Sequence, residues 1–253
     1  MSLTKPYRRT CRPRLDGRYG GEYLRHPHFA QEPRHFVRAF LSLQADLMVL
    51  MDYIEPADAN LRAYSHKTQQ LLVRACVEVE ANLTAILREN GYGSGKLTMN
   101  DYRLVEHSHR LSGYRIRIPM WRGTASVRQP FARWAEVGQH LTWYRAYNKS
   151  KHDRHEHFQL ATFEALIDAV AGLLVVLSAQ FWTEDYSSTE QSLTVESGYD
   201  TDDGMDSGIG GFFRVQFPVD WSSDERYSFN WQTLRDEPDP FITFDYGAVK
   251  APS

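Results

Sequence analysis

Apolar residues recur at helical spacing through most of the middle of this chain. In residues 33–56 and 57–90 they fall three or four positions apart, which gathers them on one face of a helix. Pro33 suits the first turn of a helix, Pro56 ends the first segment, and Gly91 is a typical residue just after a helix. The pattern therefore predicts two long amphipathic helices over these segments.

The same periodicity returns in two later segments. Residues 130–152 place a largely aromatic stripe on one face, with Gly138 as a point where the helix breaks. Residues 159–182 are apolar nearly all round near their middle, so this helix is either the most buried element or part of an oligomer seam. With a shorter helix over 100–111, these segments predict a bundle that spans about 33–182.

The two ends of the chain have different patterns. Residues 1–32 are rich in Arg, Gly, Pro and Tyr without periodicity, which predicts an irregular arm. Residues 183–253 begin with an acidic, turn-rich stretch and continue with short aromatic and β-branched runs, which are typical of strands. Residues 114–119 are expected to form a short strand or an extended loop, and the runs 212–219, 226–231 and 241–246 are expected to form two or three strands.

Together these segments predict a mainly α protein with three parts. We expect an irregular basic N-terminal arm, a four- to five-helix bundle, and a small β-rich, acidic C-terminal appendage. Their expected bounds are 1–32, 33–182 and 183–253.

Charge is divided unevenly between these parts. Residues 1–38 hold nine Lys and Arg against three Asp and Glu, whereas residues 183–253 hold four against fifteen. A basic arm attracts nucleic acid by displacing its counterions, and an acidic tail covers a basic surface or keeps the protein in solution. The simpler interpretation is a solvated, partly disordered arm and an ordinary acidic surface.

Composition limits the class of protein. The two cysteines make neither a disulfide framework nor a four-cysteine zinc site, and they suit a reducing compartment. The first residues lack the apolar stretch of a signal peptide, and the longest apolar run, 169–179, is shorter than the ~20 residues of a membrane span. We therefore expect a cytoplasmic protein without membrane association.

The residues most typical of a chemical site lie in the stretch WYRAYNKSKHDR at 143–154. If this stretch is helical, Arg145 and His152 lie close to two turns apart on one face, with Asn148 between them. Metal-independent cleavage of RNA needs an imidazole as general acid or base and a guanidinium that stabilises the charge of the phosphorane. The pattern therefore predicts a catalytic stripe of Arg145, Asn148 and His152.

Other residues of this stretch fit binding roles. Lys151 and Arg154 flank the stripe and are expected to hold neighbouring phosphates. Tyr147 offers a ring on which a base of single-stranded RNA can stack. No metal and no cofactor are expected to take part.

Arg145-x6-His152 resembles the R-x4-6-H signature of the HEPN superfamily, and YNKSKHDR is similar to the YN-x-x-KH-x-R pattern of HEPN-like bacterial proteins. The resemblance covers about 35–182. It implies a helical bundle that acts as a metal-independent endoribonuclease, as in toxin–antitoxin, anti-phage defence and RNA-processing systems, and leaves a 2′,3′-cyclic phosphate. It also implies a homodimer whose motifs meet at the interface, with RNA as substrate and an antitoxin or defence-system protein as partner.

The resemblance assigns a role to Glu80 and leaves one departure. Residues 71–87 are similar to the helix that the family packs against its motif, so Glu80 is expected to pair with Arg145 and orient its guanidinium. Ala146 stands where active members usually carry Asn, Asp or His. We expect Asn148 to take over that orienting role.

Two alternative functions stay open. The bundle is a catalytically inactive RNA- or protein-binding module if Ala146 marks a decayed site. It is a metal-dependent hydrolase if the cluster HDRHEH at 152–157 binds a metal, although neither HExxH nor paired cysteines occur. The same residues also have purely structural interpretations: Arg145 and His152 as helix-end residues, Lys151 and Arg154 as a solvated face, and Glu80 as one half of a surface ion pair.

Overall fold

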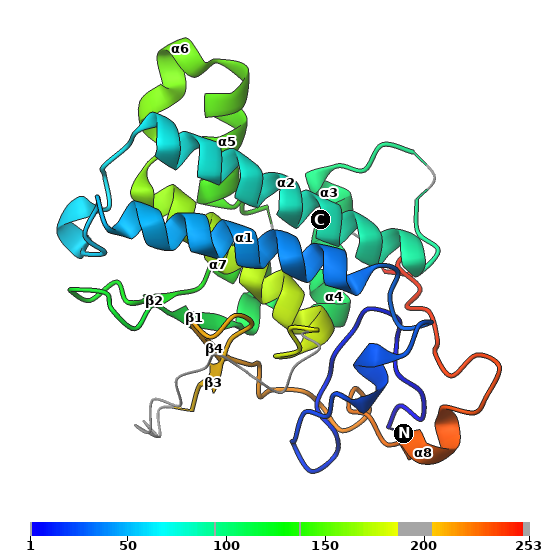
Figure 1. The fold of residues 1–253 in the computed structure, drawn as a ribbon. Coiled ribbons are helices and arrows are strands. Elements are labelled where there is room, and N and C mark those ends of the chain that lie inside the picture. Colours follow the sequence, from blue (N-terminus) through cyan, green and yellow to red (C-terminus); the bar gives the residue numbers. More distant parts are fainter. Residues whose placement is uncertain (1, 94, 137, 187–203, 250–253) are drawn as a thin grey trace.

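A computed structural model describes residues 2–93, 95–136, 138–186 and 204–249 of the 253-residue chain. The protein is mainly α with a small antiparallel sheet, which confirms the predicted fold class in this coarse form (Figure 1). The helices are α1 Pro33–Met51, α2 His66–Glu89, α3 Met99–Arg103, α4 Glu106–His109, α5 Thr142–His152, α6 Arg154–His157, α7 Phe163–Phe181 and α8 Trp231–Leu234. The 3-10 turns are η1 Glu22–Arg25, η2 Asp58–Asn60, η3 Leu111–Gly113, η4 Ala132–Ala135 and η5 Phe158–Leu160.

Local capping chemistry sets the helix ends. Helix α1 begins at Pro33, as the sequence predicts, and α2 begins after Ser65, whose Oγ accepts a hydrogen bond from the Thr68 N–H at 3.1 Å. Residues 57–65, predicted as helix, instead form a turn and an extended entry to this cap. The predicted helix 130–152 is also interrupted: Gly138 has a φ of +74°, so only its second half forms α5.

Helix α7 lies at the centre of the protein and packs against α2, α5 and α1. It is long and apolar enough to cross a membrane by length and composition, but 89% of its apolar window is buried inside the protein. It therefore forms the buried core of the bundle. Its contact with α5 is close, because a Cβ atom at Gly172 would lie 3.2 Å from Cζ2 of Trp143.

The sheet joins the middle of the chain to its C-terminal part. Its strands are β1 Arg115–Arg117, β2 Val127–Arg128, β3 Asp206–Ser207 and β4 Arg214–Gln216, in the order β2-β1-β4-β3. Ile116 of β1 pairs with Val215 of β4, and both side chains are fully buried. The C-terminal part is thus paired with the bundle and is not a separate appendage.

Only part of the predicted β structure forms in the described residues. The runs 114–119 and 212–219 contain β1 and β4, so these two predictions are confirmed. The runs 226–231 and 241–246 make isolated parallel bridges, Tyr227 to Leu3 and to Arg14, and Ile242 to Tyr7. The acidic stretch 187–203 lies outside the described residues.

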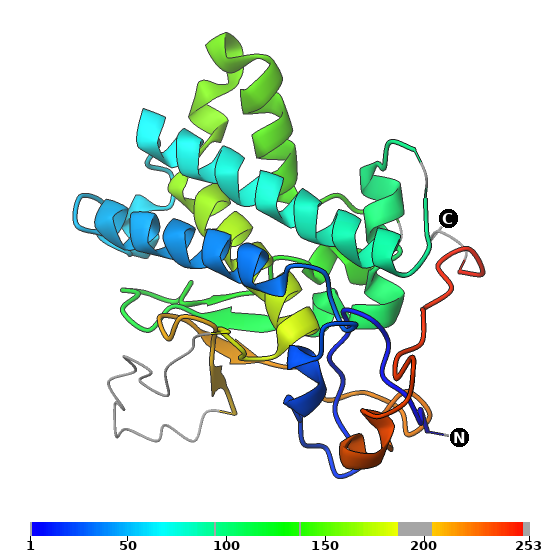
Figure 2. The ribbon, with the colours of Figure 1, turned by 45° about the vertical axis from the view of Figure 1, so that its right-hand side comes forward.

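The basic N-terminal segment is buried at its centre. Arg9 and Thr10 are 0% exposed and Arg12 is 3% exposed, whereas residues 14–18 are exposed, so the interpretation of a solvated arm is wrong for residues 9–13. In Figures 1 and 2 this segment, in blue, lies side by side with the orange and red C-terminal segment against one end of the bundle. The two segments pair through the bridges named above and supply each other's backbone hydrogen bonds.

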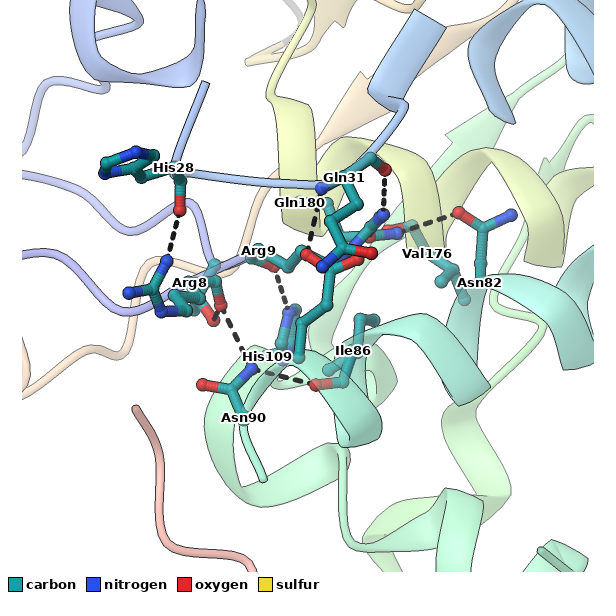
Figure 3. Close-up of polar contacts among 12 residues, drawn as sticks. Arg8, Arg9, His28, Gln31, Asn82, Ile86, Asn90, His109, Val176 and Gln180 are labelled. Carbon is teal, nitrogen blue, oxygen red and sulfur yellow. Dashed lines mark hydrogen bonds and ion pairs between the residues drawn. The ribbon is translucent and has the colours of Figure 1, made fainter. Parts of the chain in front are cut away.

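Arg9 is buried among several polar partners, which Figure 3 shows in part. Its Nε lies 2.7 Å from Oε1 of Glu89 on α2, and its Nη1 donates to Oε1 of Gln180 on α7 at 2.8 Å. Its Nη2 donates to the carbonyl oxygen of Gln31, and its guanidinium lies 4.7 Å from the ring centre of Phe36. Burial lowers the pKa of Arg9, and the neighbouring Glu89 opposes this effect. The arginine therefore ties the N-terminal segment to two core helices.

Candidate functional site

Helix α5 presents two different faces. Trp143, Tyr147 and Ser150 are buried on the inner face, and Trp143 Nε1 donates to the carbonyl oxygen of Pro130 at 2.9 Å. Gln69 of α2 donates from Nε2 to the Ser150 carbonyl oxygen at 3.0 Å, which satisfies one of the free carbonyls in the last turn of α5. The outer face is therefore held in a fixed orientation.

The predicted catalytic stripe lies on this outer face. Thr142–His152 is one continuous helix. The seven residues from Arg145 to His152 fall only ~20° short of two full turns, so both side chains lie on one face, and their backbones are separated by ~10.5 Å along the helix axis. Both side chains are exposed, and Asn148 between them is half-buried. Within the described residues, none of the three side chains makes a hydrogen bond or ion pair. The guanidinium and the imidazole are both accessible to a ligand from solvent.

Glu80 does not orient Arg145. Its carboxylate accepts a hydrogen bond from the Tyr144 hydroxyl at 2.7 Å, and no ion pair with Arg145 occurs. Burial raises the pKa of Tyr144, and its hydrogen bond to Glu80 raises it further. Tyr144 precedes Arg145 by one residue, about 100° around the helix, so α5 turns the tyrosine toward α2 and the arginine toward solvent.

Tyr147 and Lys151 form a pair of their own. Tyr147 is 0% exposed, so the prediction that it stacks a base is wrong. The Lys151 Nζ donates to the Tyr147 hydroxyl at 2.8 Å and lies 4.9 Å from the centre of its ring. This hydrogen bond raises the pKa of Lys151. Lys151 is exposed but already partnered, which limits its freedom to hold a phosphate.

Arg154 begins α6, immediately beyond the stripe. The Asp153 carboxylate accepts from the Glu156 N–H at 3.3 Å and so caps this short helix. Arg154 is exposed and, in the part of the chain that the structure describes, has no partner for its guanidinium. The exposed basic residues of α5 and α6 are Arg145, Lys149, Lys151, His152, Arg154 and His155.

One group of side chains has the spacing of a metal site. Ligand atoms of Asp153, Glu156 and His157 all lie within 4.8 Å of one another, with the carboxylates exposed and the imidazole half-buried. Sequence reasoning assigned this possibility to the histidines of 152–157 as a whole, but His152 and His155 are not in the group. The i, i+3, i+4 spacing of Asp, Glu and His is the signal that identifies it.

The surroundings of Ala146 and Asn148 bear on the predicted orienting role of Asn148. Ala146 is half-buried and packs against the core. Asn148 makes no hydrogen bond to Arg145 or His152 in the described structure, so its orienting role stays a prediction. A polar residue at position 146 would lie at the edge of the core, beside the stripe.

Two hollows described in the protein lie elsewhere. Volumes of about 420 Å³ and 170 Å³ adjoin each other and share Arg14, Tyr227 and Phe229 as lining residues. None of the predicted site residues lines either hollow. Sequence analysis missed this region because it assigned the aromatic run 226–231 to a strand. Small molecules bind in concave sites, whereas the α5 stripe is an open face.

Comparison of the chain with protein-family models, with curated proteins and with solved structures found no match. The resemblance to the HEPN superfamily therefore rests on the sequence motifs at 71–87 and 145–154 alone.

Proposed function

We propose that this protein is a metal-independent endoribonuclease of HEPN type, with its site on the outer face of α5. The observation that supports the proposal is the joint exposure of Arg145 and His152 on one face of one continuous helix. An open, basic face suits a polymer, because a polyanionic chain can lie along a surface that would not enclose a small substrate.

The proposed chemistry uses two groups. Neutral His152 accepts the proton of the ribose 2′-hydroxyl, and the 2′-oxygen attacks phosphorus. The bond from phosphorus to the 5′-oxygen breaks, which leaves a 2′,3′-cyclic phosphate and a 5′-hydroxyl. The leaving oxygen takes its proton from an imidazolium of a second copy or from water. Arg145 stabilises the negative charge on the phosphorane, and Asn148 positions the pair.

Supporting roles are narrower than the sequence predicts. Arg154 has an unpartnered guanidinium for a neighbouring phosphate, whereas Lys151 already gives one of its three N–H donors to Tyr147. The resemblance also implies a homodimer in which two stripes meet, an antitoxin or defence-system protein as partner, and a cytoplasmic location. These remain parts of the proposal. Sedimentation or size-exclusion measurements of the full chain test the dimer.

The decisive experiment compares wild type with Arg145→Ala and His152→Ala on total RNA, with and without EDTA. Removal of either group lowers the cleavage rate by about 10²–10⁴-fold, because each acts on the transition state. His155→Ala is the matched control, since His155 is exposed nearby but lies off the stripe. Cleavage that persists in both stripe variants would refute the proposal, and binding of RNA without any cleavage would favour the inactive module.

A second candidate function rests on the group of Asp153, Glu156 and His157. Carboxylate and imidazole ligands within 4.8 Å of one another are compatible with a divalent metal ion that activates water for hydrolysis. Under this alternative, EDTA abolishes cleavage and Asp153→Asn reproduces the loss. EDTA-resistant cleavage excludes it.

A further inference from the structure

An exposed aromatic cluster stands at the start of α2, close to the end of α5. It consists of Tyr64, His66 and Phe158. The rings of His66 and Phe158 have their centres 4.7 Å apart at an angle of 37°, and those of Tyr64 and Phe158 lie 5.6 Å apart, edge to face. Tyr64 is 52% exposed, His66 is exposed, and Phe158 is half-buried between them. Ring surface is thus kept in contact with water.

The backbone holds this cluster in place. Tyr64 forms an antiparallel bridge with Thr162, and the Phe163 N–H donates to the carbonyl oxygen of Ala63 at 2.7 Å. His66 is fixed as the first residue of α2, directly after the Ser65 cap. Because the rings are arranged before any ligand arrives, a ligand that stacks on them loses little free energy to their ordering.

The start of α2 lies beside the last turn of α5 (Figures 1 and 2). Gln69, one turn along α2 from His66, is bound to the last turn of α5 through the Ser150 carbonyl oxygen. Phe158 follows α6, which itself begins two residues after His152. Two exposed cations are close to the rings in sequence: Lys67 follows His66 on α2, and Arg154 on α6 precedes Phe158 by four residues. The exposed carboxylates of Asp153 and Glu156 are the opposing charges in that part of the chain.

We infer that this cluster is a stacking platform for an unpaired base, so that the substrate class of the α5 site is single-stranded RNA. Exposed rings beside cations are the features by which proteins bind single strands, because every base has a π-face and every linkage a phosphate. A duplex hides its base faces within the helix and cannot use the platform. The assignment of a substrate to the α5 site depends on the proposed function, whereas the binding platform can be measured without it.

The test measures equilibrium binding of a fluorescent single-stranded oligoribonucleotide to the full chain carrying His152→Ala, which prevents turnover. Adding Tyr64→Ala to this background is expected to weaken binding by about 5- to 100-fold, the usual effect of losing one stacked base. Tyr64→Phe should restore it, because the ring is retained. The matched control is Tyr53→Ala, since Tyr53 is 83% exposed and has no ring partner among the described residues.

Two further measurements make the result specific. Duplex RNA of the same sequence should bind with equal affinity to the Tyr64→Ala protein and to its parent, and His66→Ala should weaken only single-strand binding. Equal effects of Tyr64→Ala and Tyr53→Ala, or equal loss of duplex binding, would overturn the inference. If wild type cleaves RNA but Tyr64→Ala binds normally, the platform fails and the nuclease stands. If wild type never cleaves but the single-strand effect appears, the platform stands alone.

Discussion

The burial of Arg9 leads to a quantitative prediction about stability. Replacing Arg9 with Met keeps an apolar stem of similar length but removes the charge that compensates Glu89. The carboxylate of Glu89, whose side chain is 14% exposed, then lacks its cation, and Gln180 Oε1 and the Gln31 carbonyl oxygen lose a donor. The buried N-terminal segment would be held by fewer contacts with α2 and α7.

The expected cost follows from the exposure of the pair. Removing one partner of a buried ion pair costs about 3–5 kcal/mol, and the partial exposure of Glu89 favours the lower end of this range. A domain is stable by only about 5–15 kcal/mol, so the loss is a large fraction of the total. The double variant with Glu89→Gln should recover part of it, since the uncompensated charge is gone and an acceptor remains for the Gln31 N–H.

Urea unfolding followed by circular dichroism measures the effect. With a slope of ~2–3 kcal/mol/M, the midpoint for Arg9→Met should fall by about 1–2 M. Arg18→Met is the matched control, because Arg18 is an exposed arginine of the same segment, and its midpoint should change by less than ~0.3 M, in keeping with ordinary surface substitutions. Equal midpoints for the two variants would show that the segment is solvated after all.

Three further predictions concern other parts of the protein. His109 is buried with its Nε2 2.8 Å from the Arg9 carbonyl oxygen, and burial lowers the pKa of its imidazole from 6.5 to about 3. Between these two pH values the unfolded chain binds a proton on His109 that the folded protein does not bind, so stability should fall as the pH drops from 6.5 toward 3. A urea midpoint that stays constant over this range would contradict the prediction. Gly123→Ala should destabilise by about 1–3 kcal/mol in urea unfolding, since φ is +124° and a Cβ would lie 2.3 Å from Cγ of Asp58, and a change within error would disprove the strain. Tyr147→Leu, which removes the ring but keeps an apolar side chain in the core, should leave the RNA affinity of the folded protein within about twofold in a gel-shift titration, because a buried ring cannot stack a base; a larger loss would return Tyr147 to the binding surface.

The helices of the bundle were predictable because their determinants are local. The periodicity of 159–182, the proline at position 33 and the glycine at 138 each act within a few residues, and each has its counterpart in α7, α1 or the start of α5. The pairing of β1 with β4 was not predictable, because it joins segments about a hundred residues apart and depends on packing that no short pattern records.

The candidate site was predictable in part for the same reason. Helical spacing alone placed Arg145 and His152 on one face of α5, but it could not determine which of the other faces of α5 packs against α2. That choice turns Tyr144 toward Glu80 and buries Tyr147, so two of the predicted roles failed together. The burial of Arg9 could not be predicted from the sequence at all. A charged residue in an aperiodic segment is ordinarily exposed, and Arg9 is buried because the fold brings Glu89 and Gln180 to it.

The pairing of the first residues with the last has a consequence for synthesis on the ribosome. Arg9 leaves the exit tunnel long before its partner Gln180. Leu3 and Tyr7 likewise emerge long before their bridge partners Tyr227 and Ile242. That end of the nascent bundle therefore stays open until Ile242 has been synthesised, and a chain truncated before Tyr227 would leave backbone groups of the N-terminal segment without their partners.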